Sequence, residues 1–283
     1  MHLKHPSVVH GFVVMALLVD DEVDLVSVAS TALEISSDDD DNIDDRIQQI
    51  EPWLDGTLRD DFMEIFCPPR IVPILKQKGF RAFLSIDISS GDQLDLSLSG
   101  DRGTCLFEMR RRRPRVLLTS SPCRWFSKLM VMFNKKKIGE TRFNEELGKA
   151  IVLFNFGMYC AILQARENSI ALHEHPIGAS SWKLPRVKEF MELGAETVGF
   201  DQCCFGLKTP GDGVLMKKPT KIITNGVHIL KQFSGQKCKG GHVHQRIMGS
   251  KFGRSLSAYA AHYPPLMCAA IADGVISEIE QVR

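Results

Sequence analysis

The sequence predicts an α/β protein with a mostly parallel central sheet and flanking helices. From Phe62 onward, short apolar runs alternate with longer amphipathic stretches, a pattern typical of repeated strand and helix units. Glycine and proline separate several of these segments, as at Gly79 and Pro114. The 283 residues are 44% hydrophobic and 24% charged, so the chain can bury one substantial core.

The expected elements follow in chain order. Short apolar and β-branched runs predict strands at 62–67, 82–88, 115–119, 169–173, 197–200 and 221–224. Amphipathic spacing predicts helices at 71–79, 144–165 and 187–193. The middle helix is the clearest, because one face would carry Leu147, Ala150, Ile151, Phe154, Met158 and Ile162.

Charge divides the chain. Residues 1–64 carry sixteen Asp and Glu against three Lys and Arg, which leaves 18 acids and 32 bases for the remainder. The run 36–45 is too polar to fold alone, so we expect residues 1–58 to be an acidic leader or linker that is partly disordered. The basic remainder favours a polyanionic partner, for which the clusters Arg110–Arg113 and Lys135–Lys137 are candidates.

Two further features indicate the compartment. The longest uninterrupted apolar stretch, Gly11 to Val19, is too short to cross a bilayer, so we expect no membrane partner. The eight cysteines lack the regular spacing of a disulfide scaffold. We therefore expect an intracellular protein, in the nucleus of a eukaryote or otherwise in the cytoplasm.

Reactive side chains follow several of the predicted strands. Because ligands of parallel sheets bind beyond the carboxyl ends of the strands, Cys67, Asp87, Cys123 and Glu174 are candidate site residues. Cys123 lies in a proline-shaped turn beside Arg124, and a thiolate stabilised by positive charge is a competent nucleophile. Glu174 lies between two histidines, and in a dry pocket its carboxyl group could orient a ring nitrogen.

These residues, in this order, resemble the DNA (cytosine-5) methyltransferases, especially phage-like and transposon-associated members. The resemblance covers about residues 62–275 and is most specific at the Pro-Cys motif. It rests on EIF at 64–66, Asp87, Gly91 and Asp92, SPC at 121–123 with Phe126 and Ser127, Glu174, KPTKIITN at 218–225, and AHYPPLMCAAIA at 261–272. It implies a Rossmann-like class I methyltransferase fold that uses S-adenosylmethionine.

The resemblance also implies roles for individual residues. Cys123 would add to C6 of a flipped cytosine, and Glu174 would engage the ring nitrogen N3 and the exocyclic amine. S-adenosylmethionine would lie near Phe66, Cys67, Asp87 and Asp92. DNA would be held by Arg110, Arg111, Arg112, Arg113, Arg124, Lys135, Lys136 and Lys137. Residues 59–206 would be the methyltransferase-like core, and 207–283 a reduced target-recognition or DNA-facing segment that returns to the core.

The sequence departs from the family pattern at two places. Cys67, Pro68, Pro69 and Arg70 replace the glycine-rich loop that lets the backbone approach the cofactor. The family's paired-arginine motif has no counterpart in VGFDQCCFG at 198–206. These departures keep open a catalytically decayed DNA-binding relic of the same fold. A further alternative is a cysteine hydrolase that pairs Cys123 with His173 or His175.

CKGGHVH at 238–244 suggests a second site. We expect a basic, glycine-rich loop that faces DNA, and no metal. The alternative is a zinc ion bound by Cys238, His242 and His244, joined by Cys203 or Cys204. The absence of a Cys-x-x-Cys pair, and the opposite directions of the two histidines on a strand, argue against zinc.

Overall fold

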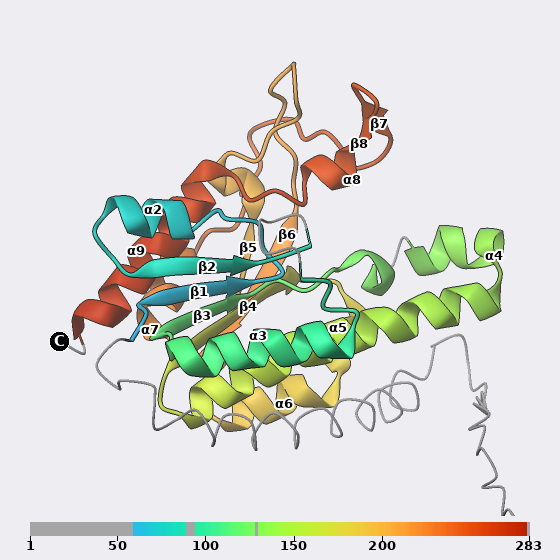
Figure 1. Ribbon diagram of the computed structural model, residues 1–283. Coiled ribbons are helices and arrows are strands. Elements are labelled where there is room, and N and C mark those ends of the chain that lie inside the picture. Colours follow the sequence, from blue (N-terminus) through green and yellow to red (C-terminus); the bar gives the residue numbers. More distant parts are fainter. Residues whose placement is uncertain (1–58, 89–93, 128–129, 282–283) are drawn as a thin grey trace, which may run out of the picture.

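The computed structural model describes residues 59–88, 94–127 and 130–281, so the acidic leader and Asp92 lie outside the described residues. Its centre is a six-stranded sheet in the order β2-β1-β3-β4-β6-β5 (Figure 1). The strands are β1 (Phe62–Ile65), β2 (Ala82–Ile86), β3 (Val116–Thr119), β4 (Ile170–Pro176), β5 (Glu196–Asp201) and β6 (Pro219–Thr224).

The sheet is mixed but mostly parallel. β2, β1, β3 and β4 run parallel to one another, whereas β6 lies antiparallel between β4 and β5. The chain forms β1 and β2, then crosses to the other side of β1 to form β3. This change of direction makes the carboxyl ends of β1 and β3 the expected ligand-binding edge.

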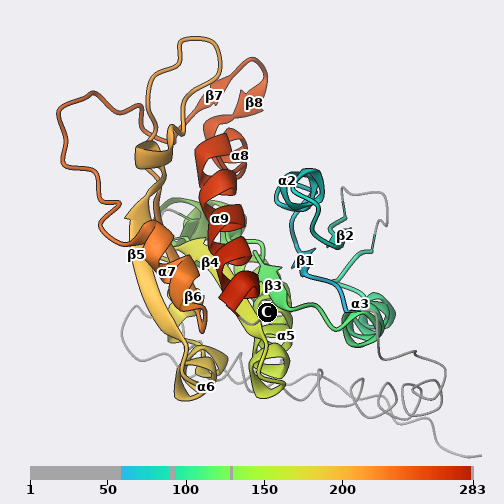
Figure 2. The same cartoon turned by 90° about the vertical axis from the view of Figure 1, so that its left-hand side faces the viewer.

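Helices cover both faces of the sheet (Figures 1 and 2). One face packs against α2 (Val72–Gln77), α7 (Val227–Phe233) and α9 (Pro265–Gln281), and the other against α3 (Ser99–Arg112), α5 (Glu140–Arg166) and α6 (Pro185–Glu192). Alternate strand residues enter opposite cores: Leu172 of β4 joins the α9 side, and Ala171 joins the α5 side.

α5 is the longest helix in the described part of the chain. Its length and apolar composition would allow it to cross a membrane. Its buried residues instead pack against β3, β4 and α6, and 61% of its most apolar window is buried within the protein. Burial of this kind is typical of a core helix.

All six predicted strands and all three predicted helices are present, with shifted ends. The first predicted strand stops at Ile65, because Phe66 adopts a left-handed backbone conformation with φ 60°. The helix predicted at 144–165 begins earlier, at Glu140. The sequence did not predict α3, α7 or α9, and α9 packs in the core on one face of the sheet.

Residues 206–218 and 234–262 form loops at the top of Figure 1, which we call the basic lobe. Its regular elements are a hairpin of β7 (Ser250–Lys251) and β8 (Arg254–Ser255) and the short helix α8 (Leu256–Tyr259). The lobe carries eight Lys and Arg against one acid, Asp212. It has a small core of its own, formed by Leu207, Met216, Leu256 and Ala260.

Candidate functional site

Cys123 follows the carboxyl end of β3, and Glu174 lies near the carboxyl end of the adjacent parallel strand β4. β3 pairs with β4 so that Thr119 is opposite His173, which places Ser120 beside Glu174. The Ser120 hydroxyl donates a hydrogen bond to Glu174 Oε2 at 3.1 Å. Cys123 follows three residues later, where the chain enters the 3₁₀ turn η2 (Arg124–Phe126). Ser120, three residues before Cys123, thus contacts Glu174 although 54 residues separate them in the sequence.

Tyr263, in the segment just before α9, also contacts Glu174. Its hydroxyl oxygen lies 2.8 Å from both Glu174 Oε2 and Ser120 Oγ. Burial, and then the nearby Glu174, raise the pKa of Tyr263 well above its usual value, so the phenol remains a hydrogen-bond donor. The other carboxyl oxygen, Glu174 Oε1, is buried and has no hydrogen-bond partner among the described residues. One carboxyl oxygen is thus held in place, and the other is buried without a hydrogen-bond partner among the described residues.

The Cys123 side chain is partly exposed. Burial raises the pKa of the Cys123 thiol, Lys218 opposes this shift, and Glu174 adds to it. The cation that lowers the pKa of the thiol is therefore Lys218, and not the neighbouring Arg124 that we expected. The Arg124 guanidinium instead lies over the Trp125 ring, 5.2 Å from its centre. Because its pKa is raised, the thiol must lose a proton before it can act as a nucleophile.

His173 and His175 point to the opposite face of β4 and pack against α5. Their Nδ1 atoms lie 2.7 Å from the Thr119 hydroxyl and 2.8 Å from the Ser181 hydroxyl, respectively. Burial lowers the pKa of His173 to about 3 and that of His175 well below its usual value. Within the described residues, neither ring is hydrogen-bonded to Cys123, so the geometry does not support the pairing that a cysteine hydrolase requires.

The loop after β1 is held by a buried carboxyl group. Glu64 accepts hydrogen bonds from the Ser85 hydroxyl at 2.6 Å and from the backbone N–H groups of Arg70 at 3.1 Å and Ile71 at 3.4 Å. Burial raises the pKa of Glu64, and these donors oppose the shift. The two amides are therefore already occupied by the protein.

The expected cofactor residues fall into two groups. Phe66 and Asp87 are partly exposed at the carboxyl ends of β1 and β2, where a cofactor could reach them. Cys67 is 1% exposed and packs in the core beside α2 and α9, so our prediction of a contact from its side chain is wrong. Asp92 cannot be placed, because it lies outside the described residues.

The arginines proposed for DNA lie far from Cys123. Arg110–Arg113 form the end of α3, just before β3 begins, whereas Cys123 follows the end of β3. Two of them bind acids: Arg112 contacts Glu108 at 3.0 Å and Asp60 at 3.1 Å, and Arg111 also contacts Glu108. The structure does not bring this cluster to the candidate site. Lys135–Lys137 belong to α4 (Lys135–Ile138), which projects beside the start of α5 in Figure 1.

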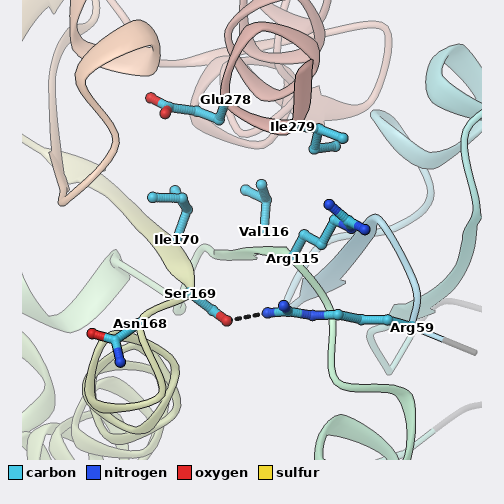
Figure 3. Close-up of a pocket in the computed structure, with 8 residues that line it drawn as sticks. All are labelled: Arg59, Arg115, Val116, Asn168, Ser169, Ile170, Glu278 and Ile279. Carbon is cyan, nitrogen blue, oxygen red and sulfur yellow. Dashed lines mark hydrogen bonds between the residues drawn. The ribbon is translucent and has the colours of Figure 1, made fainter. Parts of the chain in front are cut away.

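An open pocket of about 380 Å³ lies at the amino ends of β3 and β4. Figure 3 shows the Arg59 guanidinium directed at the Ser169 hydroxyl, with Glu278 and Ile279 of α9 on the opposite side. Arg59 also donates to the Arg113 carbonyl at 2.8 Å. These contacts tie the start of the described chain to the sheet. The pocket lies at the opposite edge from Cys123 and Glu174.

A second cluster lies in the basic lobe. Cys203, Cys238, His242 and His244 have their potential ligand atoms within 4.8 Å of one another, so they form a group that could hold a metal ion. Cys203 comes from the 3₁₀ turn η5 (Gln202–Phe205), directly after β5. The other three residues are not on a strand, so our argument that the histidines diverge is wrong.

Sequence patterns did not single out Tyr263, Ser120 or Lys218 as site residues. Tyr263 and Lys218 stand within the two C-terminal segments on which the family resemblance rests, but no spacing rule connects them to Cys123. No protein-family model and no curated protein matches the chain. The functional argument therefore depends on the geometry of the carboxyl edge of the sheet and on the order of the motifs.

Proposed function

We propose that the protein is a DNA cytosine-5 methyltransferase-like enzyme that acts on a flipped cytosine. The observation that carries the proposal is the buried, unpaired oxygen of Glu174, whose carboxyl group lies near the Cys123 thiol at the carboxyl edge of the sheet. The sheet is compatible with it, because a mostly parallel sheet with helices on both faces is a Rossmann-like arrangement. A partly exposed cysteine near a buried carboxyl group fits a nucleophile paired with a group that binds a base edge.

The two side chains would divide the chemistry. After its thiol loses a proton, Cys123 forms a bond from sulfur to C6 of cytosine, and electron density moves into the ring. Glu174 Oε1 would accept a hydrogen bond from the exocyclic amine, and a proton shared between Oε1 and N3 would neutralise the charge that accumulates there. C5 then takes the methyl group, a water molecule takes the C5 proton, and the bond between sulfur and C6 breaks to restore the thiolate. Lys218 favours that thiolate, because it opposes the rise in the thiol pKa.

S-adenosylmethionine would supply the electrophilic methyl group. Phe66 and Asp87 fit such a cofactor, because both lie at the carboxyl edge on neighbouring strands, one with an aromatic ring and one with a carboxylate for hydroxyl groups. Lys135–Lys137, Arg124 and the basic lobe would hold the DNA backbone, because they offer cations to phosphates. Extruding the base costs about a few kcal/mol, which such contacts offset.

One observation favours a DNA-binding relic as a second candidate. The loop after β1 carries two prolines, and the Glu64 carboxyl group occupies two of its backbone amides. A loop of this kind has few free donors for a cofactor. A relic would bind DNA but neither S-adenosylmethionine nor C6 of the base.

Covalent trapping tests the enzyme proposal. The full chain is mixed with S-adenosylmethionine and DNA that contains 5-fluorocytosine, which lacks the C5 proton and so prevents release of the enzyme. We expect a covalent protein–DNA adduct that Cys123→Ala abolishes and that the matched variant Cys204→Ala retains, since Cys204 is an exposed cysteine of the turn η5 outside the candidate site. Glu174→Gln should form less adduct. An adduct that survives Cys123→Ala refutes the mechanism.

Calorimetry separates the two candidates. The enzyme predicts a heat of binding for S-adenosylmethionine that Asp87→Ala weakens. The relic predicts binding of duplex DNA, no heat with S-adenosylmethionine and no adduct. Absence of both DNA binding and the adduct would reject both candidates.

A further inference from the structure

Four side chains from two distant segments converge at the base of the basic lobe. Cys203 is 5% exposed and follows β5, whereas Cys238, His242 and His244 lie in the loop after α7. Cys238 Sγ lies 3.6 Å from His242 Nε2 and 3.5 Å from His244 Nε2, and the two Nε2 atoms are 2.8 Å apart. Cys204 is exposed and is not part of this group.

The distances match the ligand shell of a tetrahedral zinc ion. With zinc–sulfur bonds of about 2.3 Å and zinc–nitrogen bonds of about 2.0–2.1 Å, a tetrahedral site places sulfur and nitrogen about 3.6 Å apart. Both measured sulfur–nitrogen distances agree with this value. The two imidazole nitrogens need only separate to about 3.3 Å. Two thiols and two imidazoles are also the ligand set that zinc prefers.

The backbone brings these side chains together through contacts outside the cluster. Asp201, two residues before Cys203, donates its N–H to the Gln236 carbonyl at 2.9 Å, and its carboxylate accepts the N–H of Cys238 at 2.9 Å. Gly240 and Gly241 have φ of 83° and 82°, a left-handed conformation that glycine adopts without strain. This reversal returns the chain toward Cys238, so the sulfur and both imidazoles face one point.

The lobe has little else to stabilise it. Its own cluster contains four fully buried apolar side chains, Leu207, Met216, Leu256 and Ala260, and the hairpin tip Phe252 is 76% exposed. Small units with so little core are commonly stabilised by a structural metal or a disulfide. Four protein ligands leave no open position on zinc, which is typical of a structural rather than a catalytic site.

From this geometry we infer that Cys203, Cys238, His242 and His244 bind one Zn²⁺ that fixes the basic lobe to the end of β5. The inference does not depend on methyl transfer. The lobe also connects with the candidate site, because Gln202, beside Cys203, donates its N–H to the carbonyl of Lys218 at 3.1 Å. Zinc would thereby help to hold the segment from which Lys218 acts on Cys123.

Metal analysis of the full, untagged chain tests the inference. Elemental mass spectrometry should find about one zinc per chain, falling to about a tenth or less in Cys203→Ser and Cys238→Ser, because a lost ligand weakens the site strongly. Cys204→Ser is the matched control and should keep its zinc. A wild-type chain without stoichiometric zinc overturns the site, as does a Cys203–Cys238 disulfide in the purified protein. Full zinc content in Cys203→Ser overturns the ligand assignment.

Cobalt substitution keeps the test decisive if the cysteine variants fail to fold. Co²⁺ added to the chelator-treated wild-type chain should give the visible absorption bands of a tetrahedral site and thiolate charge-transfer bands in the ultraviolet, and Zn²⁺ should displace both. An octahedral spectrum would refute the site. Chelation should also speed tryptic cleavage at Lys237, Lys239 and Arg246 while the sheet remains resistant; unchanged cleavage of this loop would refute the structural role. None of these measurements requires DNA or S-adenosylmethionine, so they fail or succeed independently of the proposed enzyme.

Discussion

The Tyr263 hydroxyl is the side-chain group whose removal best tests the candidate site. In Tyr263→Phe the ring keeps its place in the core, but Glu174 Oε2 loses a partner at 2.8 Å and retains only the Ser120 hydroxyl at 3.1 Å. The other carboxyl oxygen has no partner to compensate. Leaving a buried polar atom short of a hydrogen bond costs about 1–3 kcal/mol. We therefore expect the free energy of unfolding to fall by about 2 kcal/mol, roughly a 30-fold change in the ratio of folded to unfolded protein.

Urea denaturation followed by tryptophan fluorescence measures this change. The midpoint should fall while its slope with denaturant stays constant, because the buried area hardly changes. Tyr259→Phe is the matched control. The Tyr259 ring packs in the lobe beside Arg254, but its hydroxyl has no hydrogen bond within the described residues, so we expect a loss below about 0.5 kcal/mol. Equal stability of the two variants would refute the hydrogen-bond network as described.

A double variant makes the same test more specific. Ser120 and Tyr263 contact the same oxygen and also each other. Removing both hydroxyl groups should therefore cost an amount that differs from the sum of the single losses by at least about 0.5 kcal/mol. Strict additivity would mean that the two hydroxyls act independently, contrary to their shared acceptor.

Three further predictions concern the surrounding structure. In Gly157→Ala the new Cβ would lie 2.7 Å from Ser121 Oγ, so we expect urea denaturation to show a loss of about 1–3 kcal/mol in the free energy of unfolding. Adding Ser121→Ala should restore the stability; no restoration would mean that another contact limits the space. In Glu64→Gln, a side-chain NH₂ group replaces one of the carboxyl oxygens that accept hydrogen bonds from the backbone N–H groups of Arg70 and Ile71. Hydrogen exchange of the loop after β1 should therefore speed up. Unchanged protection would show that the carboxyl group does not anchor the loop. The pKa values of His173 and His175 are lowered in the folded protein, so their contribution to the free energy of unfolding should be fully present above about pH 6.5. It should decline as the pH falls toward 3, by about 1.4 kcal/mol per pH unit for each ring. A flat stability profile between about pH 7 and 5 would contradict the burial of the two rings in the neutral form.

The strands could be predicted because their signal is local. A buried strand in a parallel sheet is a short apolar run, and β3, with the sequence VLLT, is readable without knowledge of its neighbours. α3 gives a weaker signal, because its fourteen residues include two glycines and a run of arginines and bury only one side of the helix. Its arginines suggested a nucleic-acid contact, whereas their partners include Glu108 and Asp60 of the same edge.

The candidate site was predictable only in part, for the same reason. Cys123 follows β3 and Glu174 lies near the end of β4, and parallel pairing necessarily brings the ends of β3 and β4 to one edge. Tyr263 reaches Glu174 across 89 residues of sequence, and Cys203 approaches the loop of His242 through a turn after another strand. These contacts depend on how α9 and the lobe fold back, which no short-range pattern encodes.

The two edges of the sheet differ in how their charged and polar groups are satisfied, and this difference points to where a ligand would bind. At the amino edge, Arg112 pairs with Asp60, Arg115 lies 3.4 Å from Asp61, and Arg59 binds the Arg113 carbonyl. Arg115 Nε makes no hydrogen bond within the described residues, but its ion pair with Asp61 offsets its burial, so these contacts need only a structural explanation. At the carboxyl edge, Glu174 keeps one buried oxygen without a partner, at a cost to stability of about 1–3 kcal/mol. In the proposed function, the exocyclic amine of a cytosine would donate a hydrogen bond to this oxygen and so offset the cost.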